Sequence, residues 1–266
     1  MYPYQKMSTT NQWMVNARRG LRFLQNLRLV DQRKLYHLWE QNHLRQVFER
    51  YEVDCVFDIG ANYGQYAEML RRRVGFRGRI ISFEPIPEAA AALRAKAAGD
   101  PNWLIQEMAV SSHDGEQVFN LMNDSEFSSL SRPKADDSLL FGYKNAVNRT
   151  VSVKTEKLQT AYLRLHGTYG FKRPFLKLDT QGFDVEIISH ARDMLSSFVG
   201  LQSELAVTPL YESSVDFRDA ITLYESCGFK MSAFVPNNAG HFPVLVETDC
   251  IMIRSDLTNP AGEVSG

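Results

Sequence analysis

Short apolar runs alternate with longer runs of helical periodicity along most of the chain. The short runs carry the β-branched and aromatic residues that favour strands, and they read VDCVFDIG, RIISFEP, NWLIQEMAV, PFLKLD and FVGLQSEL. Helix-type runs lie between them, beginning near Gly64 and continuing with PEAAAALRAKAA, FDVEIISHA and DFRDAITLYESC. Strands that alternate with helices predict an α/β fold, with a mostly parallel sheet and helices on both faces.

Two further strands close this pattern. GFKMSAFV and TDCIMIR have no helix between them, so they predict an antiparallel hairpin. EQVFNLM and RTVSVKT predict an additional strand pair around a polar loop, NDSEFSSLSRPKADDSLL, whose Ser, Asp and Pro content resists regular structure. Because loops over strand ends vary with substrate, we expect the stretch SSLSRPKADDSLLFGYKNAVN to form a mobile lid or an acceptor-binding loop.

The first fifty residues differ from the rest in charge and periodicity. Leucines recur near helical spacing and predict two amphipathic helices that meet near Val30. Nine Lys and Arg against three acids give this segment a charge of +6, and the remainder carries −7. We favour a helical layer on the main domain, with a basic patch for an anionic partner as the alternative. The predicted division is an N-terminal helical segment (1–50), a main domain (51–256) and a C-terminal tail (257–266).

Composition narrows the class of protein. With 44% apolar and 23% charged residues, the 266-residue chain is typical of a soluble globular protein. No run approaches the roughly eighteen apolar residues of a membrane span, and the N-terminus lacks a secretory segment. We therefore expect no transmembrane segment and a cytoplasmic location. Cys55, Cys227 and Cys250 are widely spaced in apolar surroundings, which favours buried side chains over a disulfide or a zinc site.

The turn after the first strand is the first candidate site. It reads Asp58-Ile-Gly60-Ala-Asn62-Tyr-Gly64, and ligands of parallel sheets bind at such strand exits. The sequence lacks the G-x-G-x-x-G of dinucleotide folds at this turn and has no Gly-Lys-Ser/Thr of a Walker A motif. An acid here opposes a pyrophosphate but favours a cationic ligand, and S-adenosylmethionine carries an ammonium and a sulfonium. We expect Gly60 to let its methionine part lie against the backbone.

A second acid follows the next strand, where RIISF ends in Glu84-Pro85. A strand-end carboxylate can accept hydrogen bonds from both ribose hydroxyls of a bound nucleoside. Such an acid serves NAD as well, so it is the combination of Glu84 with the acidic glycine turn that indicates S-adenosylmethionine. The exit of the third strand, Met108-Ala109-Val110, is expected to line the adenine.

Several stretches, in this order, carry a resemblance to a known family: FDIGANYGQYAEML, ISFEPIPEAAAAL, MAVSSHDGE, SSLS, FLKLDTQGFDVEII, LQSELAVTPLYE and ITLYESCGF. From about Val53 to Arg254 the chain resembles the FkbM family of methyltransferases. The resemblance implies a class I, Rossmann-like methyltransferase fold with a seven-stranded sheet, S-adenosylmethionine as the donor, and usually O-methylation of a sugar or natural-product hydroxyl. It assigns cofactor positions to Asp58, Gly60, Asn62, Gly64 and Glu84.

One departure from the family pattern is DTQG, where many relatives have D-x-E-G. Gln181 stands in place of an acid and is therefore not assigned proton transfer.

Methyl transfer to a hydroxyl needs a general base or a metal that lowers the hydroxyl pKa. Asp179 ends PFLKLD and Glu204 ends GLQSEL, so both acids are expected to face the cofactor. Either Mg²⁺ bridges them, or one acid, its pKa raised by the other, is the base. We favour the metal-free form because no third ligand stands out. Asp179 alternatively caps the helix near Gly182, and His241, in PNNAGHF, is the next candidate base.

The expected acceptor is a small molecule or a glycan, and no nucleic acid partner is expected. The N/D-P-P-Y/F/W tetrapeptide of base-amine methylation is missing from the sequence. An RNA or protein methyltransferase, and a cofactor-binding partner protein that has lost catalysis, are the alternatives. The residues name neither the acceptor nor the oligomeric state.

Overall fold

The computed structural model describes residues 35–124, 127–134, 146–236 and 243–258. The first of the two expected N-terminal helices, residues 135–145 of the predicted lid and His241 lie outside the described residues. The chain divides into two units between Leu35 and Tyr36, and both β-sheets belong to the unit that begins at Tyr36.

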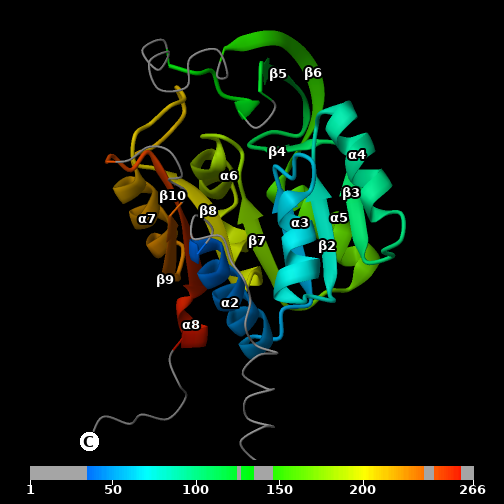
Figure 1. Ribbon diagram of the computed structural model, residues 1–266, viewed down its shortest axis with the longest axis vertical. Coiled ribbons are helices and arrows are strands. Elements are labelled where there is room, and N and C mark those ends of the chain that lie inside the picture. Colours follow the sequence, from blue (N-terminus) through cyan, green and yellow to red (C-terminus); the bar gives the residue numbers. More distant parts are fainter. Residues whose placement is uncertain (1–34, 125–126, 135–145, 237–242, 259–266) are drawn as a thin grey trace, which may run out of the picture. The chain divides into compact units, whose positions relative to one another are not determined.

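Seven strands form the main sheet in the order β3-β2-β1-β7-β8-β10-β9 (Figure 1). Neighbouring strands pair in parallel except β10, which runs antiparallel to both β8 and β9. The predicted α/β fold with a mostly parallel seven-stranded sheet is therefore confirmed, and β9 and β10 form the predicted antiparallel hairpin. The strands are β1 (Cys55–Ile59), β2 (Arg79–Phe83), β3 (Trp103–Gln106), β7 (Pro174–Leu178), β8 (Gly200–Ala206), β9 (Phe229–Pro236) and β10 (Glu247–Arg254).

Helices cover both faces of the main sheet. One face packs against α2 (Leu35–Arg50), α3 (Gln65–Met69) with its π-helical continuation Leu70–Val74, and α4 (Pro87–Ala97). The other packs against α5 (Leu158–Tyr169), α6 (Asp184–His190) and α7 (Phe217–Ser226). A 3-10 turn (Arg192–Ser197) and the short α8 (Ser255–Thr258) complete the helices among the described residues.

Strand residues alternate between these two helical layers. Phe57 lies in the core against α5 to α7, and its neighbour Val56 lies in the core against α2 to α4. This period of two is expected of a strand that is buried on both faces. Among the described residues no helix is long and apolar enough to span a membrane.

A second sheet has the order β4-β6-β5 and lies beyond the carboxyl ends of the main strands (Figure 1). It contains β4 (Ala109–Ser111), β5 (Gly115–Met122) and β6 (Val147–Lys157), so the additional strand pair predicted from EQVFNLM and RTVSVKT is present. The run NWLIQEMAV does not form one strand as predicted. It breaks after Gln106, where the Met108 amide donates to the Gln106 carbonyl at 2.9 Å, and the chain then enters the second sheet.

The second of the expected N-terminal helices is α2, and its apolar side is part of the core. Leu44 and Val47 are buried, and the Phe48 ring packs edge-on against Phe76 and Phe175, with centroids 5.2 and 5.1 Å away. The opposite side carries Trp39, which is 47% exposed. The helix thus packs on the sheet as a layer, while the predicted domain bounds at residues 50 and 256 stay predictions.

We expect Phe48→Ala to lower the free energy of unfolding by about 3–5 kcal/mol, because it removes a buried aromatic ring and leaves a cavity beneath α2. The matched change on the outer side of the helix, Trp39→Ala, should cost less than about 1 kcal/mol. Urea unfolding of both variants measures the difference. Equal effects would mean that α2 does not pack as described.

Candidate functional site

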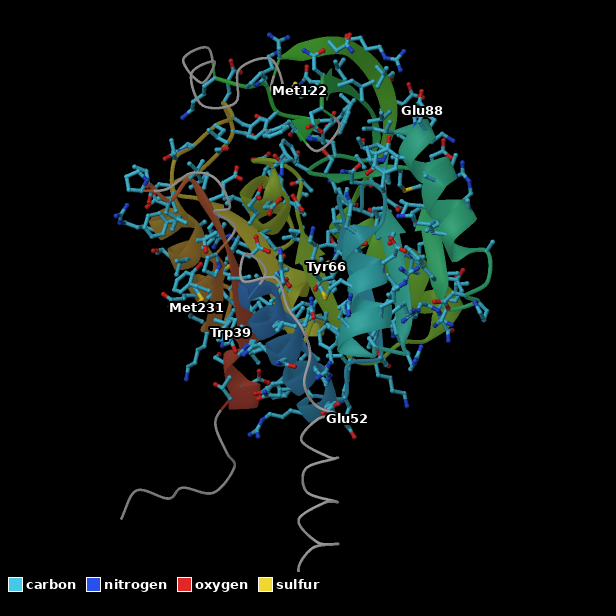
Figure 2. The ribbon with its side chains drawn as sticks, in the orientation of Figure 1. Trp39, Glu52, Tyr66, Glu88, Met122 and Met231 are labelled. Atoms are coloured by element: carbon cyan, nitrogen blue, oxygen red, sulfur yellow. The ribbon has the colours of Figure 1, made fainter. Side chains whose placement is uncertain are left out.

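A cavity of about 700 Å³ opens at the carboxyl ends of the central strands. Its walls come from the turns after β1, β2 and β7, from β4, β8 and β10, and from α2 and α3. Tyr66, on α3, is one of the lining residues and lies near the middle of the domain, far from Glu88 at the margin (Figure 2). The strand exits therefore surround one cavity, as expected for a parallel sheet.

The turn after β1 places Gly60 and Asn62 on the cavity wall, both with positive φ (78° and 47°). Glycine at position 60 is required by packing as well as by conformation. An added Cβ would lie 1.9 Å from the Asp179 carbonyl oxygen, which belongs to the turn after β7. Asn62 Oδ1 is buried and has no hydrogen-bond partner among the described residues. This turn thus leaves a polar group available to a ligand.

Two other predicted residues of this turn lie behind the cavity rather than on its described wall. Asp58 is fully buried and accepts a hydrogen bond from Ser82 Oγ at 2.9 Å. The Ser82 hydroxyl in turn accepts a hydrogen bond from Trp103 Nε1 at 3.0 Å. Burial raises the pKa of Asp58, although the Lys177 ammonium opposes that shift. An added Cβ on Gly64 would meet the side chains of Leu93 and Trp103, so this glycine packs against the core.

Glu84, at the end of β2, lines the cavity and connects two turns. Its Oε2 accepts a hydrogen bond from the backbone N–H of Asn62, and its Oε1 accepts one from the backbone N–H of Ile86, both at 2.8 Å. Burial raises the pKa of Glu84 to about 7, although these two hydrogen bonds favour the charged form. The carboxyl group therefore titrates near neutrality and retains lone pairs that can accept from a ligand.

An apolar slot continues from Glu84. Its lining residues are Pro85, Ile86, Ala109, Val110 and Phe119, so β4, which follows Met108, contributes to the cavity, and its assignment to the adenine stays a prediction. Met108 itself is not among the described lining residues. It packs against the core, with its sulfur 3.9 Å from Arg164 Nη2.

The two candidate catalytic acids meet in this cavity through a third residue. Gln181 Nε2 donates to Asp179 Oδ1 at 3.0 Å and to Glu204 Oε2 at 3.1 Å. β7 and β8 are neighbours in the sheet, which is why their exits bring the two carboxyl groups together. The N-terminus of α6 has no side-chain cap, so the structure does not support the alternative that Asp179 caps this helix.

Lys177 holds the other oxygen of Asp179. Its Nζ lies 2.8 Å from Asp179 Oδ2 and 5.3 Å from the centroid of the Tyr66 ring. Burial opposes the ammonium, but the carboxylates of Asp179 and Asp58 outweigh it and raise the pKa of Lys177. Burial likewise acts against the Asp179 charge, yet the Lys177 ammonium and the bonds from Lys177 and Gln181 lower the pKa of Asp179.

Glu204 has the opposite electrostatic surroundings. Burial, followed by the nearby charges of Glu247 and Asp179, raises the pKa of Glu204 well above its usual range. These opposite pKa shifts favour the charged form of Asp179 and the neutral form of Glu204, a difference that reduces the repulsion between two close carboxyl groups.

A second group of polar residues in the same cavity was missed by sequence reasoning. Gln202 Nε2 donates to Glu40 Oε1 at 2.9 Å and to Asp249 Oδ2 at 2.8 Å, and Tyr66 donates to Gln202 Oε1 at 3.1 Å. These residues come from α2, α3, β8 and β10, and no local motif joins them. The acid in LYHLWEQ and the alternating acids of ETDCIMIR were the available signals.

The metal-bridged form predicted for the acid pair has limited support. No group of three or more His, Cys, Asp or Glu is arranged to hold a metal ion anywhere in the described part of the chain. The Gln181 amide donates to both carboxyl groups, so an ion bridging them would have to displace it.

Three features together define a class I methyltransferase fold. The sheet has this strand order with one antiparallel strand, β10, next to the edge, a glycine turn follows β1, and an acid follows β2. The sequence model described as the methyltransferase FkbM domain matches residues 58–231. The chain therefore belongs to this family of methyltransferases.

Solved structures resemble the chain only distantly. An FkbM methyltransferase from Methylobacillus flagellatus KT is 11% identical, with 76% of this chain and 44% of that chain covered and a TM-score of 0.43. Fibrillarin of Aeropyrum pernix, bound to S-adenosyl-L-methionine, is 12% identical over 81% and 74% of the two chains, with a TM-score of 0.43. Magnesium protoporphyrin IX methyltransferase from Synechocystis PCC 6803 is 9% identical over 94% and 100%, with a TM-score of 0.44. No curated protein sequence matches the chain.

We expect Glu84→Ala to weaken S-adenosylmethionine binding by about 1–3 kcal/mol, the scale of lost charge-assisted hydrogen bonds. Isothermal titration with S-adenosylhomocysteine measures the loss. Glu88→Ala, which removes an acid four residues later at the surface, is the matched control and should bind like the parent. Unchanged affinity in a folded Glu84→Ala protein would remove Glu84 from the site.

The raised carboxyl pKa values predict a pH dependence of stability. Burial raises the pKa of Glu247 to about 7 and that of Asp249 to about 8, so the folded state holds these protons at pH values where the unfolded chain has released them. Stability is then greatest below about pH 4 for these groups and falls as pH rises toward about 8. Thermal unfolding of the parent and of Asp249→Asn between these limits checks the sign. A parent that gains stability over this range relative to the variant would contradict it.

Proposed function

We propose that this methyltransferase transfers a methyl group to a hydroxyl of a sugar, a glycan or a related natural product. The observation that carries the proposal is the acid pair, in which Asp179 and Glu204, joined by the Gln181 amide, share the cavity with the glycine turn after β1. A hydroxyl is a weak nucleophile and needs a base, and an ionised carboxylate on the cavity wall supplies one.

The residues present fit S-adenosylmethionine. We assign Glu84 to the ribose hydroxyls, Pro85 and Ala109 to the apolar slot for the adenine, and Gly60 with Asn62 to the methionine part. Asp58 and Gly64 act from behind the wall, where they shape the turn. When bound, the donor supplies a methyl group already activated by its sulfonium, so the chain has to align the acceptor and exclude water.

In this proposal Asp179 accepts the hydroxyl proton. As the new oxygen–carbon bond forms, the hydroxyl becomes a strong acid, so a carboxylate of low pKa is a sufficient base late in the transfer. Lys177 keeps that carboxylate ionised through its bond to Oδ2. The neutral Glu204 can donate a hydrogen bond to a second oxygen of the acceptor and so orient it.

The charges of the cavity disfavour a phosphate-bearing acceptor. Five carboxyl groups line the region around the acid pair, and Lys177 is the only Lys or Arg among the described lining residues. Such a wall offers a phosphate only one ammonium group, which is already paired with Asp179, and its carboxyl oxygens favour a ligand that donates hydrogen bonds. The five are Glu40, Asp179, Glu204, Glu247 and Asp249. We therefore rank an RNA methyltransferase below a sugar O-methyltransferase.

The alternative of a partner protein that has lost catalysis has less support. Asp179, Lys177 and Glu204 form a hydrogen-bonded arrangement that structural stability alone does not require, because close carboxyl groups are costly to bury. A sequence that had lost catalysis would be free to replace them.

We expect Asp179→Asn to lower kcat about 10²-fold or more while its affinity for S-adenosylhomocysteine stays within a few-fold of the parent. The assay is mass-spectrometric detection of a +CH₂ product on neutral oligosaccharides, followed by kinetics on the best acceptor. Asp193→Asn, at an exposed position after α6, is the matched control and should behave like the parent.

Two results would count against this assignment. Near-parent kcat in both Asp179→Asn and Glu204→Gln would mean that neither acid is catalytic, and His241 would then be tested next. Activity lost in EDTA and restored by Mg²⁺ would favour the metal-bridged form over the metal-free form.

A further inference from the structure

The orientation of the Gln181 amide is determined by its neighbours. Its Nε2 faces Asp179 and Glu204, and its Oε1 lies 2.9 Å from the Tyr211 hydroxyl, whose one hydrogen is shared with the Phe127 carbonyl at 3.0 Å. The reversed amide would place its oxygen against an ionised carboxylate, which is repulsive. Both hydrogens of the amide are therefore committed to the two acids.

The backbone at this position is held in an unfavourable conformation. Gln181 has φ of +54°, in the left-handed region that non-glycine residues seldom adopt. The one hydroxyl hydrogen of Ser129 is shared between two carbonyl oxygens, that of Gln181 at 2.8 Å from Oγ and that of Thr180 at 3.0 Å. A strained residue held by surrounding hydrogen bonds in a cavity wall indicates a functional constraint on where its side chain points.

Gln202 makes the same kind of contacts in a more buried part of the same cavity. It too donates to two acids and accepts from a tyrosine, but Gln202 is 1% exposed, and its acid partner Glu40 is 8% exposed. By contrast, 40% of the Asp179 side chain is exposed. Asp249, the other acid partner of Gln202, is partly exposed, as Glu204 is, so the two amides differ most in the exposure of Asp179, and Gln202 provides an internal comparison.

We propose that Gln181 is a positioning residue for methyl transfer, whose neutral amide occupies the place between Asp179 and Glu204 that a shared proton or a cation would otherwise fill. This inference rests on the proposed function and goes beyond it, because it assigns the fixed placement of the two carboxyl groups relative to each other to a specific donor. Gln181 transfers no proton itself. It keeps one oxygen of Asp179 fixed while Lys177 fixes the other.

The test measures the ionisation of Asp179 directly, without an acceptor. Carboxyl ¹³C NMR titrations would compare the parent with Gln181→Met, which keeps side-chain length but donates no hydrogen bond, and Asp179→Asn would assign the signal. Loss of the amide should raise the pKa of Asp179, because the bond favours the charged form. The pH at which kcat falls on the acid side should rise by the same amount.

Gln202→Met is the matched control, because the amide that it removes donates to Glu40 and Asp249 instead of to Asp179 and Glu204. It should shift the Asp179 signal much less. Tyr211→Phe keeps the amide but removes its orienting donor, so a smaller shift in the same direction is expected. Should Gln181→Met not fold, Tyr211→Phe carries the test.

An unchanged Asp179 titration in a folded Gln181→Met protein, or in Tyr211→Phe when it stands alone, would overturn the inference. S-adenosylhomocysteine titration of the same samples separates this outcome from failure of the proposed function. A parent that does not bind S-adenosylhomocysteine contradicts the proposed function, whereas binding with no change in titration contradicts the role of Gln181 only.

Discussion

The site depends on how six carboxyl groups and one ammonium group are accommodated in a single cavity. Burial disfavours each charge, and close carboxyl groups repel one another. The structure meets this constraint with neutral donors. Gln181 and Gln202 each donate to two acids and each accepts from a tyrosine, while Lys177 holds Asp179. One acid can then remain ionised beside neutral ones, and this difference is what allows a base to face an acceptor.

Backbone contact aligns the two halves of the cavity. Gly60 approaches the Asp179 carbonyl so closely that no side chain fits between them, and the Asp179 amide donates to the Ile59 carbonyl at 3.0 Å. The turn proposed to hold the donor is therefore fixed against the turn that carries the proposed base. Because methyl transfer requires in-line alignment, a rigid connection between these turns is itself a contribution to catalysis.

The fold was predictable because its signals are local. The alternation of strand-type and helix-type runs predicted the parallel sheet, and Asp58, Glu84, Asp179 and Glu204 were found because they end apolar runs. Lys177 was missed because it sits inside such a run, and Glu40 and Asp249 because they meet Gln202 only when α2, β8 and β10 come together. Gly60 was expected to lie against a ligand, whereas its close approach to the Asp179 carbonyl is by itself enough to require glycine at this position. Which side chains converge depends on strand order, and periodicity does not report strand order.

The most direct test is to follow the methyl group itself. The protein would be incubated with S-adenosyl-L-methionine labelled with ¹³C in the methyl group and with separate neutral glycan, RNA and protein fractions, and the products examined by NMR. The account predicts label in the glycan fraction at the chemical shift of an O-methyl ether. Label on RNA or protein, with none on the glycans, would contradict it.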